Sequence, residues 1–209
     1  YFKGWRPQFY GLGVEGSTIA IIGMGAIGQA IAQRLNGWDA KLVYTDQQAL
    51  AAEKQAALNL EFMTLDEALA QADIVIMALP LNSQTQHLMN QQRLQQMQPG
   101  SFLVNPCRGS VVDEAAILRL LESGHLAGYA SDVFEMEDWA RDDRPNEIDP
   151  NFLAHPNTLF TAHIGSAVSD VRLAIEKRAA ENILRVLHDG QPLDPANQIR
   201  IERKQSCSI

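Results

Sequence analysis

Short runs of apolar and β-branched residues recur along the chain, and between them apolar residues return every three or four positions. Such runs are typical of strands buried on both faces, and the second pattern is typical of amphipathic helices. The alternation of the two predicts an α/β fold with a doubly wound parallel sheet. We expect strands at residues 18–22, 41–45, 73–79, 101–105, 128–133 and 157–161. We expect helices at residues 29–35, 48–58, 65–72, 85–88, 90–97, 114–122 and 166–187, with 1–17 and 135–150 irregular.

Three glycines follow the first predicted strand with the spacing G-x-G-x-x-G, namely Gly23, Gly25 and Gly28. A predicted helix comes directly after them, and this strand–loop–helix setting is the one that a dinucleotide-binding loop requires. Gly23 suits the tight turn, Gly25 leaves room for a pyrophosphate, and Gly28 allows helix and strand to pack closely. The free N–H groups at the start of the helix favour phosphate binding.

Asp46 stands directly after the second predicted strand, at the distance from the glycines that is typical of the ribose-binding acid. A carboxylate there accepts hydrogen bonds from both ribose hydroxyls of NAD and repels the 2′-phosphate of NADP. The alternative is an ordinary strand–turn–helix unit with a solvated aspartate. Strand, glycine spacing and acid together favour an NAD site.

Composition narrows the class of partner. The chain has 209 residues, 46% of them hydrophobic, which is enough for a packed core, and a formal net charge of −8 at pH 7. An acidic surface argues against nucleic acid and anionic membranes as partners. Cys107 and Cys207 lie far apart in sequence, so they suggest neither a metal site nor a disulfide framework. With no apolar run of ~20 residues and no signal-peptide pattern, we expect a cytoplasmic protein.

Reactive side chains follow several of the predicted strands. Arg108 comes after strand 101–105, Asp132 closes the next strand with Glu137 beyond it, and His163 follows the last. In open α/β sheets, ligands bind outside the carboxyl ends of the strands. A guanidinium suits an anionic substrate, and an imidazole beside a carboxylate suits acid–base catalysis. Taken singly, each residue also has an ordinary structural explanation: a surface salt bridge, a solvated acid, a turn histidine.

Three stretches, residues 105–114, 132–137 and 163–166, resemble the signatures of the D-isomer-specific 2-hydroxyacid dehydrogenases. Within that family, stretches 4–11 and 135–145 are most similar to the phosphonate (phosphite) dehydrogenase branch. The resemblance implies a Rossmann-type NAD-binding domain at 12–162. It also implies a remnant of a substrate domain formed by 1–11 and 163–209. We expect the rest of that domain to be absent from this sequence and the full-length protein to be a homodimer.

The resemblance also implies roles for individual residues. Arg108, Glu137 and His163 match the catalytic set of the family, and Glu137 rather than Glu135 is the matching acid. Arg108 and four further residues match a site for a small anionic substrate: Trp5, Tyr10, Ser166 and Arg172. The cofactor is expected to be NAD, and no metal is implied. The matching NAD contacts are Gly23, Gly25, Ala26, Ile27, Gly28, Asp46, Leu79, Pro80, Pro106, Cys107, Asp132 and Gly165.

Three functions are compatible with these residues. The first is an NAD-dependent oxidoreductase that converts phosphite to phosphate, which residues 4–11 and 135–145 favour. The second is a D-2-hydroxyacid dehydrogenase for a substrate such as glycerate or lactate, which uses the same catalytic set. The third is a non-catalytic, NAD-sensing corepressor-like protein, against which the presence of Arg108, Glu137 and His163 argues.

Overall fold

A computed structural model describes residues 13–196, so Trp5 and Tyr10 lie outside the described residues. The chain divides into two compact units, Tyr1–Ala162 and His163–Ile209, which we call the first and the second unit.

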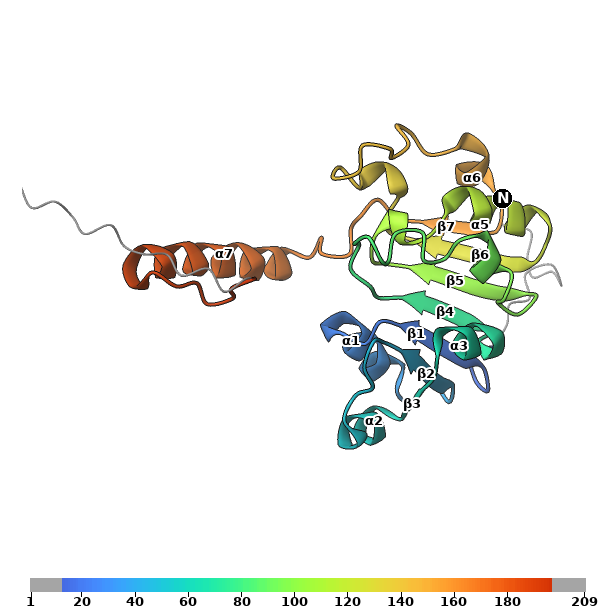
Figure 1. Ribbon diagram of the computed structural model, residues 1–209, viewed down its shortest axis with the longest axis horizontal. Coiled ribbons are helices and arrows are strands. Elements are labelled where there is room, and N and C mark those ends of the chain that lie inside the picture. The colour runs from blue at the N-terminus through green and yellow to red at the C-terminus, as the bar shows by residue number, and fades with distance from the viewer. Residues whose placement is uncertain (1–12, 197–209) are drawn as a thin grey trace, which may run out of the picture. The chain divides into compact units, whose positions relative to one another are not determined.

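The first unit contains a seven-stranded sheet in which all neighbouring strands are parallel (Figure 1). The strands are β1 (Thr18–Ile22), β2 (Lys41–Thr45), β3 (Leu60–Phe62), β4 (Ile74–Met77), β5 (Ser101–Asn105), β6 (Leu126–Ser131) and β7 (Thr158–Phe160). Their order across the sheet is β3-β2-β1-β4-β5-β6-β7. The order reverses between β1 and β4, and such a switch point is where ligands bind in doubly wound sheets. The predicted fold class is therefore confirmed.

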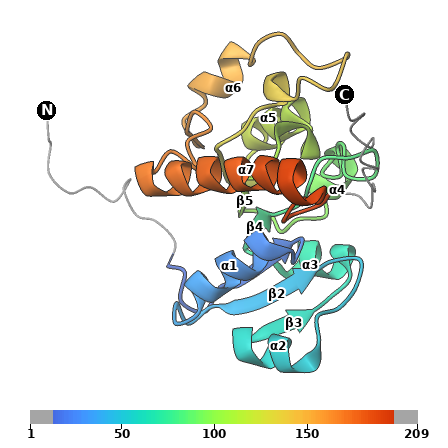
Figure 2. The same cartoon turned by 90° about the vertical axis from the view of Figure 1, so that its left-hand side faces the viewer.

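Helices cover both faces of the sheet. On one face, α1 (Ala26–Leu35) packs on β1 and α2 (Ala52–Leu58) lies beside β3 (Figure 2). The other face carries α3 (Leu65–Gln71), α4 (Gln91–Leu94), α5 (Glu114–Glu122) and α6 (Pro150–Ala154). Two short 3₁₀ turns, η2 (Gly109–Val111) and η3 (Glu135–Glu137), follow β5 and β6.

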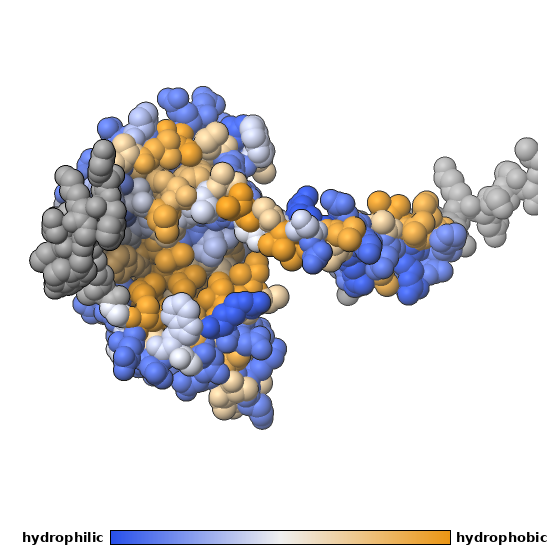
Figure 3. Space-filling model, turned by 180° about the vertical axis from the view of Figure 1, so that it is seen from behind, coloured by the Kyte–Doolittle hydropathy of each residue, from blue (hydrophilic) through white to orange (hydrophobic). Residues whose placement is uncertain are grey.

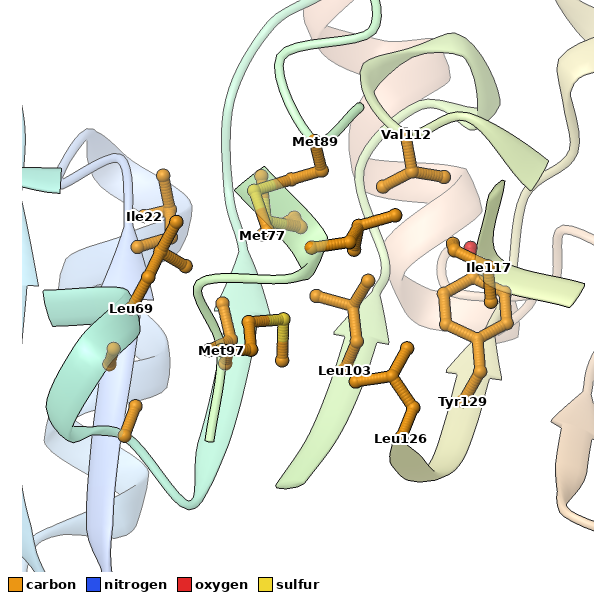
Figure 4. Close-up of a cluster of buried hydrophobic side chains, with 14 of the residues drawn as sticks. Ile22, Leu69, Met77, Met89, Met97, Leu103, Val112, Ile117, Leu126 and Tyr129 are labelled. Atoms are coloured by element: carbon orange, nitrogen blue, oxygen red, sulfur yellow. The ribbon is translucent and has the colours of Figure 1, made fainter. Parts of the chain in front are cut away.

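The alternation of side chains along each strand produces two separate apolar cores. In β1, Ile19 and Ile21 belong to the core under α1 and α2, whereas Ala20 and Ile22 belong to the larger core on the opposite face. Figure 4 shows the larger core, where strand residues meet side chains of α3, α5 and the loops between them. Its labelled members are Ile22, Leu69, Met77, Met89, Met97, Leu103, Val112, Ile117, Leu126 and Tyr129.

One predicted helix is wrong. Residues 85–88 form turns rather than a helix, because side chains there take over the backbone hydrogen bonds. Asn82 Oδ1 accepts from the N–H groups of Gln84 (2.8 Å) and Thr85 (3.1 Å). The Thr85 hydroxyl donates to the Pro80 carbonyl at 2.6 Å. Such Asn and Thr bonds compete with helix formation.

Two elements of the structure were not predicted from the sequence. Strand β3 has only three residues, and two of them, Glu61 and Phe62, are exposed, so it lacks an apolar run. Helix α6 begins inside the stretch expected to be irregular, at Pro150, with Asp149 accepting from the Asn151 N–H at 2.8 Å. Proline in the first turn after an aspartate cap is a strong helix start, and this signal was available in the sequence.

The described part of the second unit contains the long helix α7 (Ser169–Asp189). Apolar side chains, among them Val171, Ile183 and Leu187, are exposed along it beside charged ones (Figure 3). It ends at Gly190, whose φ of 74° is left-handed, and Arg178 then holds Asp194 through two hydrogen bonds of 2.7 Å. Among the helices that the structure describes, none combines the length and the apolar character needed to span a bilayer.

Candidate functional site

The glycine loop connects β1 to α1 at the switch point of the sheet. Gly23 has a φ of +98°, and a Cβ there would lie 2.6 Å from the Ala78 carbonyl oxygen. A Cβ on Gly28 would lie 2.1 Å from the Gly23 carbonyl oxygen, so α1 meets the loop more closely than any side chain would allow. Gly25 is different, because a Cβ on it would meet no atom within 4 Å. The backbone at Gly25 therefore faces open space.

Helix α1 begins without a side-chain cap. Gly25 occupies the capping position, and the first turn carries no acidic residue. Ala26, Ile27 and Gly28 follow, and Ile27 is 61% exposed. The N–H groups of a first helical turn have no partner within the helix, and together with the helix dipole they attract phosphate. The start of α1 therefore has features that suit an anionic group, and the role of Ala26, Ile27 and Gly28 as cofactor contacts stays a prediction.

Asp46 links the end of β2 to the glycine loop. Its Oδ2 accepts from the Met24 N–H at 2.6 Å, and its Oδ1 accepts from the Gln47 N–H at 2.6 Å. Each carboxylate oxygen has a second lone pair, so the half-buried side chain can accept further hydrogen bonds from hydroxyl groups. Asp46 also holds the loop in shape, a role that the sequence did not reveal.

A cavity of about 490 Å³ opens between the glycine loop and the loop after β4. It brings together five of the predicted cofactor contacts: Gly23, Gly25, Asp46, Leu79 and Pro80. Its other walls include Leu65, Asn82 and Thr85. Sequence reasoning missed Asn82 and Thr85 as cavity residues: Thr85 was placed in a predicted helix at 85–88, and Asn82, just before it, was given no role. The Asn-Ser pair shortly after Pro80 was the available signal for a turn.

The loop after β5 carries the predicted residues Pro106, Cys107 and Arg108. The fully buried Asn105 shapes this loop, because its Nδ2 donates to the Arg108 carbonyl at 2.9 Å and its Oδ1 accepts from the Cys107 N–H at 3.2 Å. Arg108 itself is exposed, with Nη1 donating to the Cys107 carbonyl at 2.6 Å. Burial raises the pKa of the Cys107 thiol, which argues for a neutral wall residue rather than a nucleophile.

The turn η3 after β6 contains two glutamates with different surroundings. Glu135 is buried, and its carboxylate accepts from His87 Nε2 at 2.8 Å and Arg141 Nη1 at 3.0 Å. Glu137 is half-buried, and its Oε1 accepts from the Phe134 N–H at 3.1 Å. The Arg141 guanidinium and the His87 ring thus hold Glu135. The assignment of Glu137 as the acid of the predicted set stays a prediction. Asp132, before this turn, accepts a hydrogen bond from the Thr161 hydroxyl.

The loop of Arg108 and the turn of Glu137 pack directly on one another through Gly109. A Cβ on Gly109 would lie 1.9 Å from the Phe134 carbonyl carbon and 2.2 Å from the Glu135 nitrogen. The Ser110 N–H also donates to the buried Asp138 carboxylate at 2.7 Å. Backbone contact without an intervening side chain therefore brings the two predicted catalytic segments together.

His163 opens the second unit, with a φ of 53°. Gly165, Ser166 and Arg172 follow it, in the segment before α7 and in its first turn. The four residues thus lie in one stretch of the second unit, whereas Arg108 and Glu137 belong to the first. Their meeting in one active site remains a prediction.

A comparison with known protein families identifies the family to which this domain belongs. The model of the D-isomer-specific 2-hydroxyacid dehydrogenase NAD-binding domain matches residues 2–165. The chain belongs to this family. NAD is accordingly the cofactor of this domain, and the residues fit it: open backbone at Gly25, an uncapped α1 and an acid at the end of β2.

Individual relatives agree with the family. The chain is 37% identical to a glyoxylate reductase of Thermofilum pendens over 91% of its length and 54% of that protein. It is 32% identical to a D-3-phosphoglycerate dehydrogenase of Bacillus subtilis over 86% of its length and 33% of the relative. The D-mandelate dehydrogenase of Rhodotorula graminis superposes with a TM-score of 0.81 at 30% identity, covering 90% of this chain and 53% of that one. The chain thus spans about half the length of the first of these dehydrogenases.

Proposed function

We propose that the protein containing this chain is an NAD-dependent dehydrogenase that interconverts a small 2-hydroxy acid and the corresponding 2-oxo acid. The observation that supports this most strongly is the common position of the glycine loop and Arg108. Gly23 follows β1, Leu79 and Pro80 follow β4, and Arg108 follows β5. These strands are adjacent and parallel, so the glycine loop and the backbone of Arg108 lie at the same end of one sheet, within reach of a common ligand.

The residues of this chain would divide the chemistry among them. Arg108 presents a planar set of N–H donors that matches a carboxylate, and charge-assisted bonds of this kind are strong. His163 would take the proton of the substrate hydroxyl, because an imidazole titrates near neutral pH. Glu137 would favour the resulting imidazolium and hold the ring. NAD, when bound, supplies a two-electron acceptor for the hydride that leaves the substrate carbon.

A second candidate substrate is phosphite. Residues 4–11 and 135–145 support it through their similarity to the phosphite dehydrogenase branch. The same residues would serve: Arg108 would hold the phosphite anion, and His163 would take a proton from the water that attacks phosphorus. The names of the relatives, glyoxylate reductase and D-3-phosphoglycerate dehydrogenase, favour the 2-hydroxy acid.

One assay of the full-length protein separates these functions. NADH formation is measured with phosphite, D-glycerate and D-lactate, and NADH consumption is measured with glyoxylate. We expect turnover with a hydroxy acid or glyoxylate; a kcat/KM for phosphite at least 100-fold above these would assign the phosphite function instead. Tight NADH binding without turnover of any substrate would support a non-catalytic, cofactor-sensing protein.

A further inference from the structure

Glu135 is the centre of a hydrogen-bonded network that the proposed reaction does not use. Its side chain is 9% exposed and lies in η3, two residues before Glu137. Its Oε2 accepts from His87 Nε2 at 2.8 Å and from Arg141 Nη1 at 3.0 Å, and its Oε1 accepts from the Glu114 N–H at 3.0 Å. The Glu135 N–H donates in turn to the Glu114 carboxylate at 2.8 Å.

His87 connects this network to the loop after β4, residues 80–87, which we call the cofactor loop. It ends the turn segment that begins at Pro80 and includes Asn82 and Thr85, three residues that line the cavity beside the glycine loop. Its backbone is left-handed, with a φ of 45°, which is unfavourable for a residue with a side chain. Two contacts hold this conformation: the His87 backbone N–H donates to the Ser110 carbonyl at 2.7 Å, and the His87 ring contacts Glu135.

Arg141 connects the same network to the turn that follows Arg108. Its Nη1 donates to the Ser110 hydroxyl at 2.6 Å as well as to Glu135. Its guanidinium also holds Asp143 through two bonds of 3.1 Å. Ser110 belongs to η2, the turn that begins directly after Arg108. The carboxylate of Glu135 thus joins the cofactor loop, the Arg108 turn and the Glu137 turn.

We propose that Glu135 is a positioning residue that couples the cofactor loop at His87 to the turns that carry Arg108 and Glu137. The coupling to catalysis rests on the proposed function. A buried carboxylate persists only where paired cations and hydrogen bonds offset its lost hydration, and removing one partner leaves the others uncompensated. Packing alone would be met by an apolar side chain. The pairing of this one acid with His87 and Arg141 instead links three segments that must be aligned for hydride transfer.

The test uses the full-length protein and the variants Glu135→Gln and His87→Gln, with Glu122→Gln as control. Glutamine keeps the shape of Glu135 but removes its charge, and the exposed Glu122 at the end of α5 loses the same charge outside the network. We expect both network variants to raise the Kd of NADH at least threefold. We expect Glu135→Gln to lower kcat at least tenfold and to shift a limb of the kcat/KM pH profile. The control leaves all of these within twofold.

A double-mutant cycle completes the test. If His87 acts through Glu135, the double variant binds NADH no more weakly than Glu135→Gln alone. Variants that bind NADH as wild type, or that lose kcat only in proportion to the unfolded fraction at the assay temperature, would overturn the proposal. Should the wild-type protein turn over no substrate, the proposed function fails, while the NADH affinities still decide whether His87 and Glu135 are coupled. His87→Gln, at a half-exposed position, keeps that decision available if Glu135→Gln does not fold.

Discussion

The Cα of Gly109 packs against the peptide that follows Phe134, so closely that a Cβ would lie 1.9 Å from the Phe134 carbonyl carbon. This contact joins the turn after Arg108 to the turn that contains Glu137. No side chain mediates this contact. The spacing of the two turns therefore requires that residue 109 has no Cβ. Every residue larger than glycine must push them apart.

We therefore expect Gly109→Ala to destabilise the chain, by at least the ~1–3 kcal/mol typical of overpacking, because the clash is with backbone. Urea unfolding of this chain measures the effect. Gly13→Ala is the matched control, since a Cβ there meets no atom within 4 Å. In the full-length enzyme, Gly109→Ala should also lower kcat/KM more than tenfold. A variant as stable as wild type would show that the two turns separate without cost.

Substitutions of the loop glycines should affect cofactor affinity and folding stability separately. Gly25→Ala has open space and a φ of −70°, so the free energy of unfolding should change by less than ~1 kcal/mol. The added methyl group would occupy the approach of the pyrophosphate, and we expect the Kd of NADH to rise at least tenfold. Gly28→Ala, 2.1 Å from the Gly23 oxygen, should instead lower stability. NADH fluorescence and urea unfolding measure the two effects, and unchanged NADH affinity in Gly25→Ala would exclude the loop as the phosphate site.

Asp46 should set the preference for NAD over NADP. Asp46→Ala with Gln47→Arg removes the carboxylate that repels a 2′-phosphate and adds a partner for it. We expect the ratio of NADP to NAD efficiency to rise at least tenfold in the full-length enzyme. The affinity for NAD should fall as well, because Met24 loses the acceptor of its N–H. An unmutated enzyme that uses NADP as efficiently as NAD would contradict this assignment.

Glu114 predicts a pH dependence of stability. Burial raises the pKa of its carboxyl to about 7, and the nearby carboxylates of Glu135, Asp138 and Glu137 add to the rise. The folded state thus binds this proton more tightly than the unfolded chain, whose glutamates have a pKa of about 4.3. The corresponding stability is present below that pKa and is lost as the pH rises through about 7.

Glu114→Gln should remove this loss. The amide oxygen can still accept from the Glu135 N–H, so stability near pH 5 should change little. At pH 8, the variant should exceed wild type by up to ~3 kcal/mol, since one pKa unit corresponds to ~1.4 kcal/mol. Urea unfolding at both pH values measures the difference, with Glu122→Gln as an exposed control. A gain that is equal at pH 5 and pH 8 would show that Glu114 is ionised in the folded protein.

Arg108 and His163 should separate substrate binding from proton transfer in the full-length enzyme. Arg108→Lys keeps the charge but loses the planar donor set, so KM should rise while kcat falls. His163→Ala removes the acid–base group, which typically contributes ~10²–10⁴-fold in rate. Both variants should bind NADH as wild type, because the glycine loop and Asp46 are untouched. Near-normal turnover of His163→Ala would make this histidine structural.

Much of the fold follows from the sequence because its signals are local. The apolar run of β1, the glycine spacing and the acid after β2 lie within one short segment, and they predict the strand, the loop and the helix in their observed order. Strand β3 escaped because an exposed, three-residue edge strand carries no apolar run. The segment 85–88 was mispredicted because Asn82 and Thr85 form turn bonds that outweigh helical spacing.

The sequence by itself determined which side chains stand after which strands, and so which residues reach the binding edge of the sheet. Only the tertiary structure decided how the turns there are held. His87 and Glu135 are 48 residues apart in sequence, and their contact exists because adjacent parallel strands deliver the segments that follow them to one edge. The same holds for Gly109 and Phe134. Periodicity reports the burial of each segment, whereas contacts between segments depend on strand order, which no local pattern encodes.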